Sequence, residues 1–156
     1  MKEKLISIMR EASQQIFTEL SSGTIVLIDT PTSDGDVEVA INLGITGQVK
    51  GTILFKSSNL TAMNIGNIML SKIGYSEPNA TFSTSHKEAV CEFTNLVCGR
   101  TLSLLSENGI DCNLTPPTLI TGVKVSPHMP QVKYTINLSI SGDFGHLEYS
   151  FAVKSD

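Results

Sequence analysis

The sequence contains no cluster of basic residues. Its 11 Lys and Arg residues are outnumbered by 15 Asp and Glu residues, which gives a formal net charge of −4 at pH 7. A surface of this charge repels nucleic acid and anionic membranes. We therefore expect neither class of partner.

Long apolar segments are also missing, since no run approaches the roughly 20 residues that span a bilayer. The N-terminal segment, residues 1–17, is charged and amphipathic and lacks the apolar core and cleavage site of a signal peptide. Cys91, Cys98 and Cys112 form an odd set without a CxxC pair, which suits a reducing compartment better than a disulfide framework. These features predict a cytoplasmic protein.

Familiar catalytic motifs are absent from the sequence as well. It has no P-loop, no CxxxxxR phosphatase loop and no array of carboxylates suited to paired metals. His86, His128 and His146 do not form a metal-ligand spacing. Cys91 and Cys98 lie near each other along a helix, but no base accompanies them to make a thiol nucleophile. We expect small, partly buried cysteines and no metal site.

What remains is the pattern of an ordinary folded domain, with 40% apolar and 17% charged residues. The length is most simply that of one domain, residues 1–156. Apolar spacing predicts helices over residues 4–20, over 58–74 with Ser58 as N-cap and Gly74 as the end, and from about Ser85 to Ser106. Strands are predicted at 24–29 (short and buried), 37–45, 52–55, 118–125, 132–140 and 146–153, with a turn at 32–36.

The order of these elements is a helix followed by three strands, twice. This order predicts a pseudo-duplicated α+β domain. The connections are too short for crossover helices, so we expect the strands to be antiparallel.

The third helix separates into two faces when residues 88–105 are wound at 100° per residue. The core-facing side carries apolar residues: Ala89, Val90, Phe93, Val97 and Leu104. The opposite side carries polar or small residues: Glu88, Glu92, Asn95 and Gly99. A hydrated helix surface explains such a stripe most simply. Gly99 weakens that interpretation, because an interior glycine costs about 1 kcal/mol relative to alanine, and it leaves a shallow place for another molecule.

The start of this helix allows two roles for Glu88. Ser83 and Ser85 are both candidate N-caps, and Glu88 lies three residues after Ser85, as a capping box requires. Glu88 is therefore either a structural cap or a contact with a partner, and the sequence leaves both open.

The string EAVCEFTNLVCG, residues 88–99, resembles the signature of the CheC/CheX/FliY family of chemotaxis phosphatases. That signature is an acid or serine, three residues, Glu, two residues, Asn, and Gly four residues later. Glu88 occupies the first position, where the family more usually has Asp or Ser. Similarity continues in order through GQVKGTILF, IMLSKIG, LTPPTLITG and SGDFGHLEYSFAV, so it covers nearly the whole chain. The first helix has Glu11-Ala12-Ser13-Gln14 where CheC-type members carry a second Glu-x-x-Asn motif, so one site remains, as in the CheX branch.

The resemblance implies a CheC-like two-layer fold, with long helices packed on the sheet, and a protein that dephosphorylates the aspartyl phosphate of a CheY-type response regulator. The regulator would supply Mg²⁺ and a lysine, so the protein would need no cofactor of its own. Asn95 would position the attacking water, and Glu92 would pair with the regulator's lysine. Glu88 and Gly99 would contact the partner. Family likeness also implies a homodimer. The alternative is a non-catalytic adaptor that binds a response regulator or a flagellar-switch component.

Overall fold

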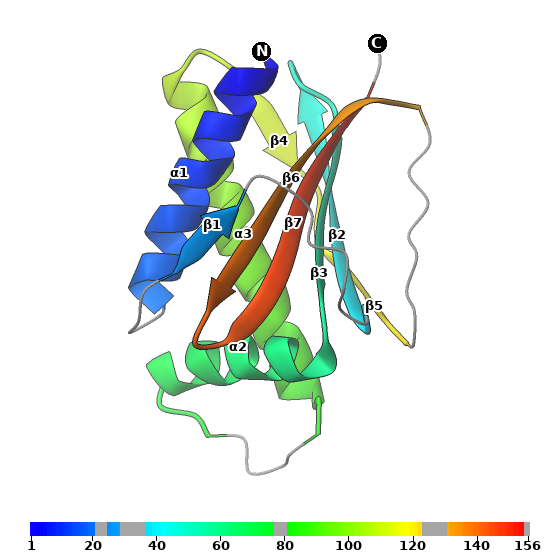
Figure 1. Ribbon diagram of the computed structural model, residues 1–156. Helices are drawn as coiled ribbons and strands as arrows, with labels where there is room; N and C mark the ends of the chain where they lie inside the picture. Colours follow the sequence, from blue (N-terminus) through cyan, green and yellow to red (C-terminus); the bar gives the residue numbers. More distant parts are fainter. Residues whose placement is uncertain (21–24, 29–36, 77–80, 123–130, 155–156) are drawn as a thin grey trace.

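The structure, a computed structural model, describes residues 1–20, 25–28, 37–76, 81–122 and 131–154 (Figure 1). These residues form three helices: α1 (Lys2–Leu20), α2 (Asn59–Lys72) and α3 (Thr84–Glu107). They also form seven strands: β1 (Val26–Ile28), β2 (Val39–Gly47), β3 (Gly51–Ser57), β4 (Cys112–Leu114), β5 (Thr118–Thr121), β6 (Val132–Gly142) and β7 (Gly145–Lys154).

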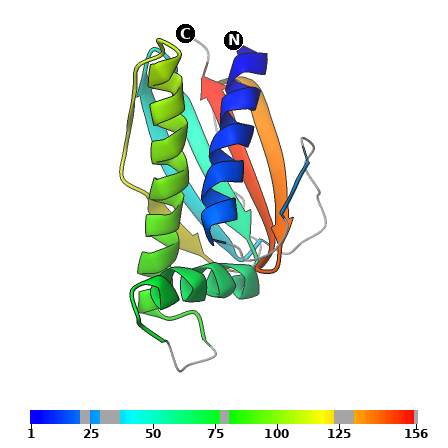
Figure 2. The same cartoon turned by 90° about the vertical axis from the view of Figure 1, so that its left-hand side faces the viewer.

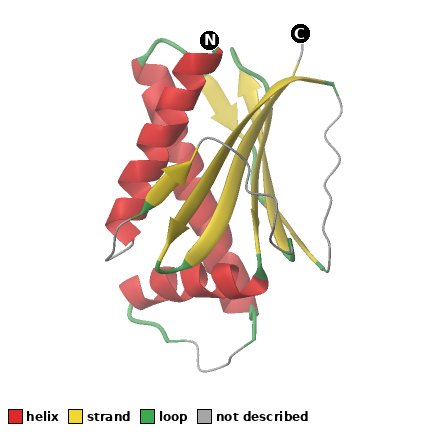
Figure 3. Cartoon of the chain, in the orientation of Figure 1, coloured by secondary structure: helices red, strands yellow, loops and turns green. Residues whose placement is uncertain are grey.

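All seven strands belong to one antiparallel sheet with the order β1-β6-β7-β3-β2-β4, and β5 pairs with β2 as well (Figure 3). β4 and β5 follow one another along the edge of β2 that does not face β3. The antiparallel arrangement predicted from the short connections is therefore confirmed.

The predicted duplication appears in the strand order. β1, β2 and β3 of the first half correspond to β4/β5, β6 and β7 of the second half. When each strand is replaced by its counterpart, the sheet has the same strand order read from the opposite edge. The central contact joins β3 of the first half to β7 of the second. Each half also lends its outer strand to the other half, since β1 pairs with β6 while β4 and β5 pair with β2. The two halves are thus interleaved.

The helices cover one face of the curled sheet (Figure 2). α1 and α3 lie side by side along this face, and α2 crosses α3 near the N-terminal end of α3. The core between the two layers contains aromatic pairs: Phe17 meets Phe93 edge-on at 5.0 Å between ring centroids, and Phe55 stacks on Tyr149 at 4.6 Å. The two-layer arrangement predicted for the fold is confirmed.

The edge strands differ from their predicted lengths. The strand expected to be buried at 24–29 is the three-residue β1 at the sheet edge, where Val26 is exposed. The strand predicted at 118–125 is described only as Thr118–Thr121, and residues 123–130 lie outside the described part of the chain. A strand that was not predicted, β4, precedes it. Pro116 and Pro117 separate the two, because proline lacks the N–H that a ladder needs. The turn predicted at 32–36 also lies outside the described residues.

The two ends of α2 match the prediction. Ser58 is the N-cap, and its Oγ accepts a hydrogen bond from the backbone N–H of Thr61 at 3.2 Å. At the other end Gly74, with φ +77°, follows the C-cap Ile73. The N–H of Gly74 donates to the carbonyl of Ser71, and that of Tyr75 donates to the carbonyl of Leu70. This pair of bonds is a Schellman motif, which fixes the direction in which the chain leaves the helix.

Candidate functional site

The candidate site is the outer side of α3, which is divided into two faces as its sequence predicts. Val90, Phe93 and Val97 are buried against the sheet and α1. On the opposite side Glu88 and Glu92 are exposed, and Asn95 and Gly99 are half-buried. The structure therefore brings all four predicted site residues onto one stripe, which covers about three turns of the helix.

The beginning of α3 is fixed by a buried histidine. Ser83 is the N-cap, and the backbone N–H of His86 donates to its Oγ at 3.2 Å. In return, Nδ1 of His86 accepts from the backbone N–H of Ser83 at 3.1 Å, which completes a capping box. Since Nδ1 accepts, Nε2 carries the proton, and it donates to Oδ1 of Asn67 on α2 at 2.7 Å. One imidazole ring thus both caps α3 and ties it to α2.

The two helices come very close at this point because α2 has a glycine there. A Cβ added at Gly66 would lie 3.2 Å from the Cα of His86. The close contact and the histidine hydrogen bond set the position of the first turns of α3, which carry Glu88 and Glu92.

Of the two roles that the sequence left open for Glu88, the structural cap is wrong. Ser83 caps the helix, and His86 occupies the position whose side chain closes the capping box. Nδ1 of His86 accepts from the N–H of Ser83, which is the part that the Glu88 carboxylate would have played toward Ser85 in a Ser85–Glu88 box. Glu88 therefore extends into solvent one turn before Glu92, with Cβ atoms about 6 Å apart at this spacing.

The side chains of Glu92 and Asn95 project from α3 toward solvent. Within the described ranges, neither side chain makes a hydrogen bond or ion pair with another protein group. The carboxylate and the carboxamide lie three residues apart on the same side of the helix and can reach a second molecule. An acid and an amide presented in this way can bind a cation and hold a polar small molecule at the same time.

Gly99 continues the stripe with open space. A Cβ added there would meet nothing within 4 Å, so nothing in the described protein requires a glycine for packing. The absence of a side chain leaves a depression one turn beyond Asn95. The contact of another molecule at Gly99 stays a prediction.

A groove runs beside Glu88 and Glu92, between the end of α2 and the first half of α3. It has a volume of about 380 Å³ and is lined by Met69, Leu70, Ile73, Tyr75, Ser85, Glu88, Ala89 and Glu92. The sequence patterns did not predict it, because residues on two helices and the connection after α2 form it together. The sequence signal that could have indicated the groove was the pair of apolar residues beside Gly74, Ile73 and Tyr75.

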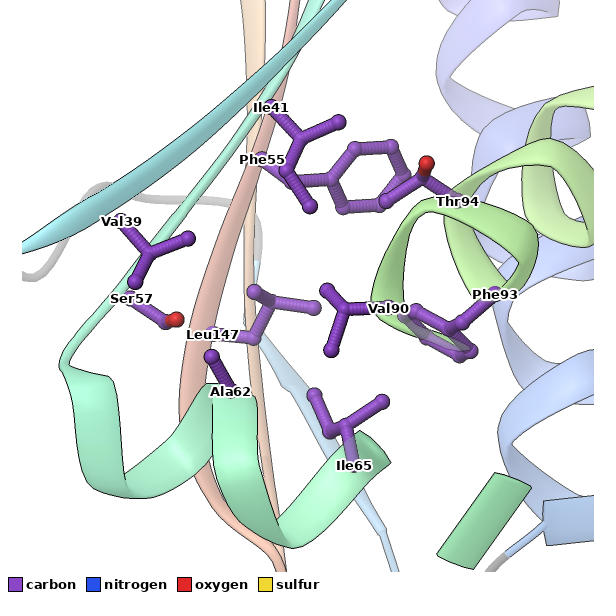
Figure 4. Close-up of a pocket in the computed structure, with 10 residues that line it drawn as sticks. All are labelled: Val39, Ile41, Phe55, Ser57, Ala62, Ile65, Val90, Phe93, Thr94 and Leu147. Atoms are coloured by element: carbon purple, nitrogen blue, oxygen red, sulfur yellow. The ribbon is translucent and has the colours of Figure 1, made fainter. Parts of the chain in front are cut away.

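A second cavity lies inside the core, between the sheet and the helices (Figure 4). Its lining is mostly aliphatic and aromatic, including Val39, Ile41, Phe55 and Phe93, and its volume is about 10 Å³. This is about the volume that one water needs. The cavity is a packing gap and is too small for a substrate.

The cysteines do not form a reactive site. All three are free thiols. Cys98 is fully buried, and burial raises the pKa of its thiol, so it stays protonated. Burial also raises the pKa of the half-buried Cys91. Both thiols are thus poor nucleophiles at neutral pH, as expected for small packing residues.

Two further properties concern the described residues as a group. In those ranges no three His, Cys, Asp or Glu side chains are close enough together to hold a metal ion. None of the three helices combines the length and the apolar character that crossing a bilayer requires.

Comparison with known proteins assigns the family. The sequence profile of the family "Chemotaxis phosphatase CheX" matches residues 39–139, which is well over half of the chain and includes the whole stripe on α3. The chain belongs to the CheX family. The predicted family and its CheX branch are therefore confirmed.

Individual relatives within and around the CheX family agree with this assignment. The CheY-P phosphatase CheX of Thermotoga maritima is 25% identical over 115 residues, which cover 72% of this chain and 70% of the relative. The crystal structure of chemotaxis protein CheX from Desulfovibrio desulfuricans superposes with a TM-score of 0.78 at 18% identity, covering 96% of this chain and 99% of that one. The CheX–CheY–BeF3–Mg²⁺ complex from Borrelia burgdorferi gives a TM-score of 0.71 at 20% identity, covering 96% and 97%. At these identities the two solved structures establish the shared fold.

Proposed function

We propose that this CheX-family protein hydrolyses the aspartyl phosphate of a CheY-type response regulator by inserting Glu92 and Asn95 into the regulator's active site. The observation that carries the proposal is the stripe on α3, where an acid and an amide have no partner among the residues that the structure describes. The Thermotoga relative is named a CheY-P phosphatase, and the Borrelia relative is in complex with CheY. Both names support the same substrate class.

Hydrolysis of an aspartyl phosphate requires little chemistry from the second protein. The bond is an acyl phosphate, and water attacks its phosphorus while the bond to the aspartate oxygen breaks. The products are the free carboxylate and inorganic phosphate. The regulator's own Mg²⁺ and lysine offset the charge that develops on the phosphoryl oxygens. The remaining requirement is a water molecule held in line with the breaking bond.

Asn95 is suited to this requirement. A carboxamide has one acceptor oxygen and two N–H donors, so it can accept a hydrogen bond from water while it donates to a neighbouring oxygen. Held on a rigid helix, it converts a random encounter with water into an oriented attack. It contributes by positioning and does not need to exchange a proton.

Glu92 acts as the anchor in this proposal. Its carboxylate pairs with the regulator's lysine and sets the depth to which Asn95 enters. Glu88 adds a contact at the rim, because it is exposed one turn earlier, and the depression at Gly99 lets the regulator's backbone approach the helix. The protein itself then needs no metal or nucleotide, since Mg²⁺ belongs to the regulator.

Two further parts of the proposal concern the assembly and its location. The outer edge of β6 pairs with β1 only at residues 139–141, and in the described chain no other strand pairs there with residues 132–138. We place a homodimer contact at this edge, which sedimentation velocity would test by showing a dimer. Free thiols and a CheY-type partner agree with a location in the cytoplasm.

The test is the decay of a phosphorylated CheY-type regulator in the presence of this protein. A catalyst at one tenth of the regulator's concentration converts all of it, faster than the regulator decays alone. An adaptor that binds without catalysis leaves the decay rate unchanged or slows it. Unchanged decay with a regulator that demonstrably binds would refute the phosphatase and favour the adaptor.

A further inference from the structure

We propose that the groove between α2 and α3 binds an apolar side chain of the response regulator and thereby selects which regulator is accepted. The occupant is an aliphatic or aromatic side chain on the receiver surface beside the active-site lysine. This inference rests on the proposed function, because it takes the docked receiver as the partner. It assigns partner selection to residues outside the Glu-x-x-Asn motif.

Two large apolar side chains are exposed at the mouth of the groove. Ile73 is 79% exposed and Tyr75 is 46% exposed. Both line the groove, together with Met69 and Leu70 from the last turns of α2. Single exposed apolar residues are common on protein surfaces, but two of them beside an apolar hollow mark a binding surface.

The backbone that carries these side chains is held in place before binding. The Schellman motif at the end of α2 fixes the backbone from Ile73 to Tyr75, with Gly74 providing the positive φ. The hydrogen bond between His86 and Asn67 fixes α2 against α3. A preformed surface loses little conformational entropy on association, which favours affinity.

The groove is continuous with the proposed catalytic stripe. Glu88 and Glu92 form one wall of the groove, so the groove and the stripe share two residues. Leu96, one turn beyond Glu92, is 41% exposed and extends the apolar surface on the other side. A receiver whose lysine pairs with Glu92 must therefore also cover the groove, which lies within one or two helical turns of that pair.

The charges agree with this occupant. Among the described residues, the lining of the groove contains two carboxylates and no cationic side chain. It therefore complements a patch that presents an apolar side chain next to a lysine, and it disfavours an acidic patch. Apolar burial around Glu92 also excludes water, which strengthens the ion pair with the lysine.

The experiment compares binding and turnover in variants of the groove. The double variant Ile73→Ser/Tyr75→Ser removes both apolar side chains, and Leu60→Ser is the matched control because Leu60 is 67% exposed in the first turn of α2, away from the groove. Titration calorimetry with a CheY-type regulator carrying BeF3 and Mg²⁺ measures Kd, and initial rates with the phosphorylated regulator give KM and kcat. Circular dichroism confirms that each variant folds.

We expect the double variant to raise Kd and KM at least tenfold while kcat stays within twofold of wild type. The control should stay within twofold in all three quantities, and the conservative pair Ile73→Leu/Tyr75→Phe should retain wild-type affinity. Wild-type affinity of the double variant would overturn the proposed role of the groove in binding, and the proposed phosphatase activity would still stand. Groove-dependent binding without turnover would support the groove and refute the phosphatase. A wild-type protein that binds no regulator would overturn both.

Discussion

The two long helices α1 and α3 occupy matching places in the interleaved halves and lie on the same face of the sheet. Starting from Glu11 and from Glu92, they bury residues in the same order. The second, third, sixth and seventh positions are buried in each, namely Ala12, Ser13, Ile16 and Phe17 in α1 and Phe93, Thr94, Val97 and Cys98 in α3. Both helices therefore present an acid and, three residues later, an amide on their outer side.

The amides and acids differ in what they contact. In α1, Nε2 of Gln14 donates to Oγ1 of Thr18 at 3.1 Å, and Nε2 of Gln15 donates to Oε1 of Glu11 at 3.3 Å. In α3, the residue one turn beyond Asn95 is Gly99, which has no side chain to accept a hydrogen bond. The comparison teaches that spacing alone does not make a site. The acid and the amide must also be free of hydrogen bonds to neighbouring side chains of their own helix.

The largest expected effect comes from removing the two amides separately. Asn95→Ala should reduce kcat by about 100-fold or more, because a misplaced water loses in-line attack. Gln14→Ala should leave kcat within twofold of wild type. Single-turnover decay of a phosphorylated regulator measures both. If the two variants lose activity equally, the distinction between the helices is wrong.

Neutralising the two acids should have a smaller effect. Glu92→Gln should raise KM about tenfold, which corresponds to about 1.4 kcal/mol of binding free energy, because an ion pair with the regulator's lysine is lost. Glu11→Gln should change KM less than twofold, since Glu11 already receives a hydrogen bond from Gln15. Steady-state rates at several regulator concentrations provide the values. A wild-type KM for Glu92→Gln would remove the anchoring role.

The smallest effect is expected at Gly99. Gly99→Ala should stabilise the free protein by about 0.5–1 kcal/mol, because the added methyl group meets open space. The same methyl group should raise KM about threefold if the regulator's backbone approaches the helix there. Thr18→Ala, at the matching place in α1, is the control for KM. Urea unfolding measures the stability, and a stabilised variant with unchanged KM would show that Gly99 is not a contact.

The two faces of α3 and the alternating strands could be predicted from the sequence. Burial of one face makes apolar residues recur about every 3.6 residues in a helix and every second residue in a strand. The start of α2 was predicted correctly at Ser58, although Ser57 and Asn59 beside it are also favoured N-cap types. At the start of α3 both Ser83 and Ser85 were candidates, and His86 closes the capping box in a position where glutamate or glutamine is the usual signal.

The edge position of β1, the strand β4 and the groove could not be predicted from local patterns. β1 and β4 have three residues each, and their places are set by β6 and β2, which are far from them along the chain. The groove depends on the contact of α2 with α3, which Gly66 and His86 allow. Such features arise from tertiary contacts, so no window of neighbouring residues contains them.

The exchange of outer strands between the halves has a consequence for how the protein forms. Val26 of β1 pairs with Ser141 of β6. The hydrogen bonds of β1 can therefore form only after more than a hundred further residues have been synthesised. Contacts between such distant segments slow folding, because a long loop must be ordered before the contact stabilises anything. We therefore expect the nascent chain to stay unfinished until its last hairpin leaves the ribosome, and neither half to be stable when expressed by itself.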